Sequence, residues 1–135
     1  MQKFELHPRL KADTVKVSRL KLCQLFLMND ACYPWLILVP ARPDITEIHH
    51  LHPCDQQQLI HEISKTSAVM DDLFNPDKIN VGALGCIVPQ LHVHIVARYK
   101  TDPAWPGPVW GATTPRPYTE DALKKRIKSL VGRMV

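Results

Sequence analysis

The stretch Val88–Arg98, with the sequence VPQLHVHIVAR, decides the fold and contains the candidate chemistry. Apolar and polar residues alternate along it, as they do in a strand whose two faces meet different surroundings. We therefore predict a strand over 87–98. One face would carry Gln90, His92, His94 and Arg98, and the other would carry Leu91, Val93, Ile95 and Ala97. Side chains two residues apart in a strand are separated by about 6.6 Å, so two imidazoles could meet one small anionic group.

Three interpretations of this histidine pair are open from the residues alone. A neutral imidazole can attack phosphorus or bind a metal, and a protonated one can stabilise a phosphate oxygen. His92 and His94 can therefore be structural residues, two metal ligands, or a nucleophile and a phosphate binder. A metal would need a third ligand, which the HHLH stretch could supply from His49, His50 or His52. That stretch precedes a proline at the expected start of a helix, where an ordinary loop is the simpler interpretation.

The remaining pattern favours an α+β fold. Short apolar runs over 22–28 and 35–39 predict two buried strands joined by a turn. Apolar residues at helical spacing predict one long helix over 55–74. A second helix is expected over 119–131, because Thr119 can cap it and acidic residues precede basic ones along it. One long helix between strands indicates helices packed on an antiparallel sheet.

Composition limits the class of protein. The chain has 135 residues, 45% hydrophobic and 22% charged, which is typical of one soluble globular domain, so we expect a single domain over 1–135. The net charge of +4 suits anionic ligands, but no basic run indicates nucleic acid. Four cysteines without zinc-finger spacing suggest reduced thiols and a cytoplasmic location. No apolar run approaches the roughly 18 residues of a membrane span, so no membrane partner is expected.

The segment before the predicted strand, KINVGALGC over 78–86, contains Gly82 and Gly85. Glycine permits close approach of the backbone to a ligand, and backbone N–H groups freed there can contact phosphate. Together with the polar face of the strand, this loop suggests an anion pocket.

The stretch Gln90–Val96, QLHVHIV, resembles the signature of the histidine triad (HIT) superfamily, H-φ-H-φ-H-φ-φ with φ apolar. The order of the other elements is similar too, and the resemblance covers roughly residues 4–110. The segment Asp102–Trp110 is similar to that of a bacterial HIT-like branch with Gln in the first triad position. The resemblance implies an antiparallel sheet of about five strands with one long helix and a C-terminal helix.

The resemblance also implies a mechanism. His92 takes the place of the nucleophile that attacks the α-phosphorus of a nucleotide, while Gln90 and His94 would hold phosphate oxygens. Asn29 matches a position that contacts the ribose, and Gly85 and Cys86 lie in the loop beside the phosphates. No cofactor is required and no metal site belongs to this mechanism, although Mg²⁺ can accompany the substrate phosphates. A small-molecule nucleotide and a second copy of the chain, in a homodimer, are the partners implied.

Three departures from the family pattern leave the function open. Gln90 replaces a histidine, Trp35 occupies a place where many members carry histidine, and Cys86 one where several hydrolases carry glutamine. The leading hypothesis is a hydrolase or transferase acting on a nucleoside phosphoanhydride, such as a dinucleoside polyphosphate, or on a phosphoramidate. A nucleotide-binding module with little turnover is the alternative. A metal-dependent hydrolase that adds a histidine of the HHLH stretch is a third.

Overall fold

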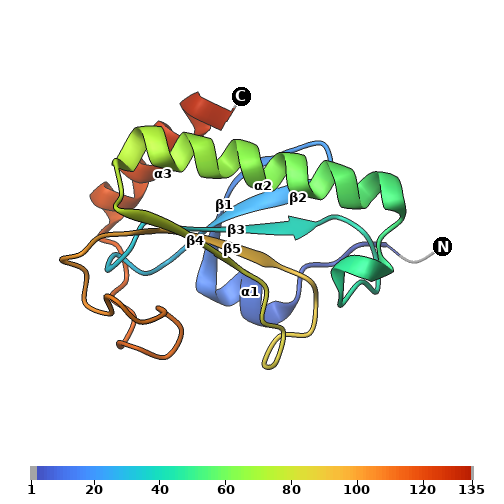
Figure 1. Ribbon diagram of the computed structural model, residues 1–135, viewed down its shortest axis with the longest axis horizontal. Coiled ribbons are helices and arrows are strands. Elements are labelled where there is room, and N and C mark those ends of the chain that lie inside the picture. The colour runs from blue at the N-terminus through green and yellow to red at the C-terminus, as the bar shows by residue number, and fades with distance from the viewer. Residues whose placement is uncertain (1–2, 135) are drawn as a thin grey trace.

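A five-stranded antiparallel sheet forms the middle of the molecule, with helices on both of its faces (Figure 1). The computed structural model describes residues 3–134. The strand order is β1-β2-β3-β5-β4, so β3 and β5 are inner strands and β1 and β4 are the edges. The elements along the chain are α1 (Pro8–Asp13), β1 (Thr14–Arg19), β2 (Cys23–Met28), β3 (Trp35–Pro40), the 3₁₀ helix η1 (Ile48–His50), α2 (Pro53–Phe74), β4 (Lys78–Gly82), β5 (Val93–Arg98) and α3 (Glu120–Met134). This arrangement confirms the α+β fold that the sequence predicts.

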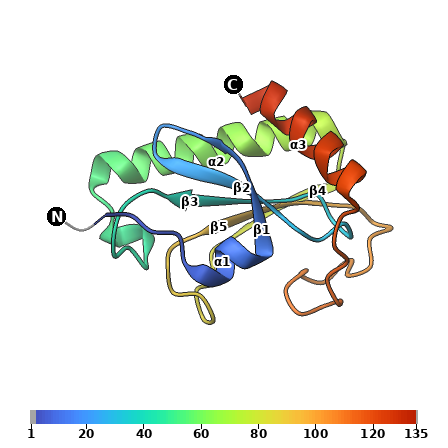
Figure 2. The ribbon, with the colours of Figure 1, turned by 180° about the vertical axis from the view of Figure 1, so that it is seen from behind.

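The two faces of the sheet carry separate apolar clusters, because side chains alternate along each strand. On β3, Leu36 and Leu38 join the larger cluster beneath α2 and α3, whereas Trp35, Ile37 and Val39 join the smaller cluster beside α1. Figure 2 shows α2 and α3 along one face and α1 on the other. The predicted alternation on the histidine stretch is also confirmed. Leu91, Val93, Ile95 and Ala97 pack in the larger cluster, and the histidines point to the opposite face.

Helix α2 begins two residues before the predicted start and ends at the predicted residue. Pro53 occupies its first turn, His52 caps it by accepting a hydrogen bond from the Cys54 N–H, and Asn75 in the left-handed conformation ends it. Inside the protein, the buried carboxylate of Glu62 accepts hydrogen bonds from the backbone N–H groups of Leu22 and Cys23. The helix is thereby fixed to the start of β2.

Helix α3 also follows the prediction at its start. The Thr119 hydroxyl accepts a hydrogen bond from the Ala122 N–H, as expected of a cap, and the helix extends three residues beyond the predicted end at 131. Leu130 and Met134 are buried against the larger cluster. In residues 3–134 no helix is both long and apolar enough to cross a membrane.

The predicted strand over 87–98 is too long, since β5 begins only at Val93. The segment before it is a loop, for a reason that can be stated residue by residue. Pro89 has no N–H to give to a ladder, and the Leu91 N–H donates to Ile45 O in the loop after β3 rather than to a neighbouring strand. The ladder to β4 ends at the Gly82–His94 pair. The histidines therefore lie at the junction of a loop and an inner strand.

Candidate active site

A cleft of about 280 Å³ opens on the face of the sheet that carries α1, directly over the two histidines. One wall is α1, another is the loop before β5, and Trp110 from the segment between β5 and α3 closes a third side. The lining includes Arg9, Leu10, Asp13, Met28, Trp35, Leu84, Gly85, Cys86, Ile87, Val88, His92, His94, Trp110 and Gly111. Most of this surface is apolar, and the two imidazoles lie on its floor. Such a cleft suits a flat apolar ring system joined to a small polar group.

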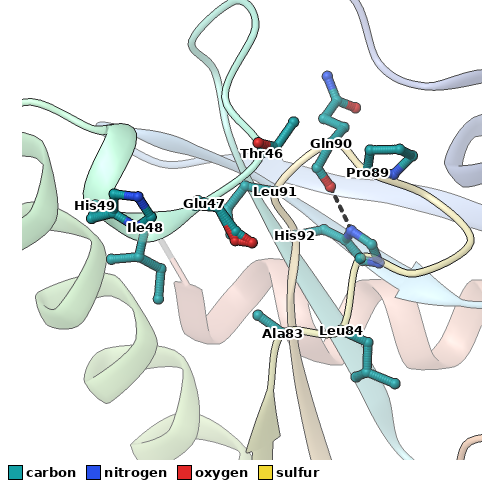
Figure 3. A pocket seen from close by; sticks show the side chains of 11 residues that line it. Thr46, Glu47, Ile48, His49, Ala83, Leu84, Pro89, Gln90, Leu91 and His92 are labelled. Carbon is teal, nitrogen blue, oxygen red and sulfur yellow. Dashed lines mark hydrogen bonds between the residues drawn. The ribbon is translucent and has the colours of Figure 1, made fainter.

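The His92 ring is held in one tautomer by its own loop. Its Nδ1 lies 2.7 Å from the backbone carbonyl oxygen of Gln90 (Figure 3). A carbonyl can only accept, so Nδ1 carries the hydrogen and Nε2 keeps a free lone pair. Burial lowers the pKa of His92, an effect that the Gln90 carbonyl opposes and the nearby charge of His7 reinforces. The neutral ring is therefore the favoured form, and it is the form that can act as a nucleophile.

The His94 ring has the opposite tautomer. The Trp35 indole N–H donates to His94 Nδ1 at 3.0 Å, so the hydrogen of the neutral ring lies on Nε2. Burial and the adjacent His92 lower the pKa of His94 to about 3. The centroids of the two imidazoles are 4.8 Å apart in an edge-to-face arrangement, and the Trp110 ring lies 5.3 Å from His94. A ring with a free Nε2 lone pair and a ring with a neutral N–H donor are thus placed side by side.

Gln90 lies where the triad pattern places it, but its side chain has other partners. Its amide oxygen accepts from the His7 N–H and its amide nitrogen donates to Glu5 O, both at 2.8 Å. Figure 3 shows this side chain pointing away from the His92 ring, while the Gln90 carbonyl is bonded to that ring. The structure therefore connects Gln90 to the histidine through its backbone and to the N-terminal segment through its side chain.

Asn29 is not brought to the cleft with the histidines. Its side-chain oxygen accepts a hydrogen bond from the Tyr118 N–H at 2.9 Å, which fixes the chain just before α3 to the end of β2. The neighbouring Met28 is the residue of this strand end that lines the cleft. Sequence reasoning could not have shown this, because the partner is 89 residues away along the chain.

Gly82 and Gly85, in the segment before β5, are needed for different structural reasons. Gly85, in the wall of the cleft, has φ +80°, a conformation that other residues rarely adopt. Gly82 makes room for an aromatic ring, since a Cβ there would lie 3.1 Å from Cη2 of Trp110. Cys86 and Ile87 follow at the rim, both exposed. Trp110 lines the cleft as well, although it lies outside the stretches that carry the predicted site residues.

A second cavity of about 260 Å³ meets the cleft at Leu84, Gly85 and His92 (Figure 3). Thr46, Glu47 and His49 form its polar side. The HHLH histidines do not join the pair on the sheet. His52 caps α2, and in the described residues, 3–134, no three His, Cys, Asp or Glu side chains are grouped so that they could hold a metal ion.

This combination of sheet, glycine loop and paired imidazoles defines the class of histidine triad folds. A family model described as HIT domain matches residues 9–101, and the chain belongs to that family. Proteins of the family commonly bind nucleotides, and many are nucleotide hydrolases or transferases.

Three solved structures are similar over nearly the whole chain. A histidine triad protein from Bradyrhizobium japonicum is 43% identical, with a TM-score of 0.97 over 99% of this chain and 100% of the other. A histidine triad protein from Marinobacter aquaeolei VT8 is 48% identical, with a TM-score of 0.93 over 99% and 100%. One from Sinorhizobium meliloti 1021 is 44% identical, with a TM-score of 0.94 over 97% of each chain. A search of curated proteins finds no match.

Proposed function

We propose that this protein cleaves a nucleotide at its α-phosphate through a covalent nucleotidyl-His92, as a hydrolase or a nucleotidyl transferase. The observation that carries the proposal is the bond between His92 Nδ1 and the Gln90 carbonyl, which leaves the Nε2 lone pair free. Although His92 is only 6% exposed, it borders both cavities, so a substrate phosphorus can approach it. A buried, neutral and oriented imidazole of this kind suits nucleophilic catalysis.

The surrounding residues take complementary roles. The apolar walls at Leu10, Met28 and Trp110 suit a nucleoside, and the loop at Gly85 and Cys86 would lie beside the phosphates. His94 offers its Nε2–H to a phosphoryl oxygen, where the developing negative charge strengthens the hydrogen bond. Gln90 acts through its backbone, because both ends of its amide are engaged by residues 5 and 7.

The reaction proceeds in two displacements. His92 Nε2 forms a bond to the α-phosphorus, the bond from phosphorus to the leaving group breaks, and the leaving group takes the electron pair. The nucleotidyl-imidazolium keeps its Nδ1 hydrogen on the Gln90 carbonyl, which stabilises the positive charge. Water or another acceptor then attacks phosphorus, and the bond from phosphorus to Nε2 breaks with its electron pair returning to Nε2. The acceptor loses its proton to solvent or to the departed group, and neutral His92 is restored. In this scheme Mg²⁺ enters only with the substrate phosphates.

The test is a panel of dinucleoside polyphosphates and adenosine phosphoramidates, assayed with the wild type and His92→Ala. We expect turnover by the wild type only, and intact-mass detection of a nucleotide adduct after rapid denaturation. His61→Ala is the matched control, since His61 is an exposed histidine on α2 away from the cleft. Equal rates in the wild type and His92→Ala, or an adduct that forms without His92, would remove the mechanism.

A nucleotide-binding module with little turnover is the second candidate. The observation that favours it is that this chain's own backbone engages both ends of the Gln90 amide and the side-chain oxygen of Asn29, which leaves fewer polar groups for a transition state. Calorimetry with AMP would show tight binding under this alternative, with no product over hours from any member of the panel. Measurable turnover that depends on His92 would exclude it.

We also propose that the protein is a homodimer, as HIT proteins often are. Strand β4 is an edge of the sheet and carries the half-exposed Val81, so its backbone and an apolar side chain are available to a partner. Light scattering after size exclusion should give twice the 15.4 kDa chain mass. A monomer at micromolar concentration would contradict the proposal.

A further inference from the structure

Trp35 enters the site from β3, the strand beside β5, and is almost completely buried. It is 7% exposed and stands opposite Val96 in the strand register. The Tyr33 ring meets it edge-on at 6.2 Å and the Trp110 ring at 6.3 Å. These contacts fix the indole plane, so the direction of its N–H toward His94 is fixed as well.

An indole differs chemically from any other polar partner that could stand here. Its N–H donates, it has no acceptor lone pair, and it does not titrate. The nitrogen that receives this bond, His94 Nδ1, must therefore be unprotonated, and the single hydrogen of the neutral ring must lie on Nε2. A hydroxyl or a second imidazole at position 35 could exchange the donor and acceptor roles, whereas an indole cannot.

The titratable groups near the pair come from several segments. His92 precedes His94 on the same face, and His7 acts on His92 from the N-terminal segment. Arg9 and Asp13 from α1 line the same cleft. Cys86 from the loop lines it as well, whereas Trp35, Trp110 and Met28 bring no ionisable group. To take a second proton, His94 would have to give up its bond with Trp35 or place a cation in an apolar pocket beside another imidazole.

We propose that Trp35 is a positioning residue that keeps His94 in a single neutral tautomer, with its Nε2–H turned to the cleft as a donor that is present throughout the physiological pH range. The catalytic part of this inference rests on the proposed function, while the tautomer itself does not. His94 would then stabilise a phosphoryl oxygen without acting as a proton source.

The tautomer can be measured without any substrate. In a long-range ¹H–¹⁵N correlation spectrum of the histidine side chains, we expect His94 to show a bare Nδ1 and a protonated Nε2. His92 should show the reverse at about pH 8, and the His94 pattern should persist from about pH 5.5 to about pH 8. Trp35→Phe keeps an aromatic ring and removes the N–H, and its His94 signals should shift toward a mixture of tautomers. A wild-type His94 that carries hydrogen on Nδ1, or that titrates within this range, would overturn the inference.

The kinetic test uses the same variants and separates this inference from the proposed function. Loss of one net hydrogen bond predicts that Trp35→Phe lowers kcat about 2- to 10-fold with little change in KM. Trp35→His keeps an N–H donor, but its neutral ring can exchange donor and acceptor roles, so its kcat at about pH 8 should lie between those of Trp35→Phe and the wild type. Tyr33→Phe, which removes a hydroxyl from the ring packed on Trp35, is the control and should retain wild-type kinetics.

Each outcome tests either the positioning role of Trp35 or the proposed function. A Trp35→Phe enzyme with wild-type kcat and pH profile would refute the positioning role. A wild type that turns over no substrate in the panel would refute the proposed function, while the nuclear magnetic resonance result would still decide whether Trp35 fixes the His94 tautomer. Should Trp35→Phe fail to fold, the wild-type spectrum and Trp35→His remain as tests.

Discussion

Acidification should destabilise this protein through His94, the buried ring that accepts a hydrogen bond from Trp35. Burial and the neighbouring His92 lower the pKa of His94 from 6.5 to about 3. At every pH between these two values, His94 therefore binds a proton in the unfolded chain but not in the folded chain. The free energy of unfolding is fully retained above the pKa of His94 in the unfolded chain, and it falls as the pH drops toward the pKa of His94 in the folded chain.

The size of the effect follows from linkage. Each pH unit inside this window costs about 1.4 kcal/mol, so a change from about pH 7 to about pH 5 removes roughly 2 kcal/mol of unfolding free energy. Burial lowers the pKa of His92 as well, and this histidine adds to the loss in the same direction. For a domain with a stability of about 5–15 kcal/mol the change is easily measured.

Urea unfolding of the wild type and His94→Gln at several pH values is the assay, since glutamine can still accept from the Trp35 N–H but does not titrate. Between about pH 7 and about pH 5 the wild type should lose roughly 2 kcal/mol more than the variant, a shift of about 1 M in the urea midpoint. His61→Gln, at an exposed position on α2, controls for the loss of a histidine. Parallel pH dependence in the wild type and His94→Gln would refute the reasoning.

Three further substitutions test the contacts that hold the site in place. Asp102→Asn breaks the buried pair with Arg98 and should cost about 3–5 kcal/mol in urea unfolding, so a loss below about 1 kcal/mol would contradict the assignment. Glu62→Gln leaves one of the Leu22 and Cys23 N–H groups without its acceptor and should cost about 1–3 kcal/mol, again by urea unfolding. Gln90→Ala should speed hydrogen exchange at the His7 amide by about 10-fold without unfolding the sheet, and unchanged protection there would show that the bond does not form in solution.

Local patterns predict those parts of the fold that depend on neighbours in the sequence. Alternation along Val93–Arg98 places His94 on the face opposite Val93 and Ile95, because successive side chains of a strand point to opposite faces. Helix α2 follows from its apolar spacing and from Pro53 and Asn75 at its ends. The edge strands β1 and β4 and the helix α1 were not individually predicted, since each is short and, unlike β2 and β3, none is a continuous apolar run.

The parts of the site that the sequence could not show are those that depend on distant partners. The amide of Gln90 bonds to Glu5 and His7, more than 80 residues away, and no local pattern encodes such a contact. The early end of the predicted strand did have a signal, because Pro89 is unsuited to the interior of a sheet. The bond from Trp35 to His94 joins two strands whose pairing is fixed only in the folded chain. Residue types therefore indicate the chemistry, and the tertiary structure decides which atoms are free to perform it.

The bonds of Gln90 link the N-terminal segment to the His92 ring. Its backbone carbonyl is bonded to the His92 ring, and its side chain is bonded to the segment that leads into α1. Any event that pulls on residues 5–7, such as the docking of a partner or the attachment of a bulky group nearby, would move the oxygen that orients His92. The orientation of the His92 ring therefore depends on the segment before α1 as well as on its own loop.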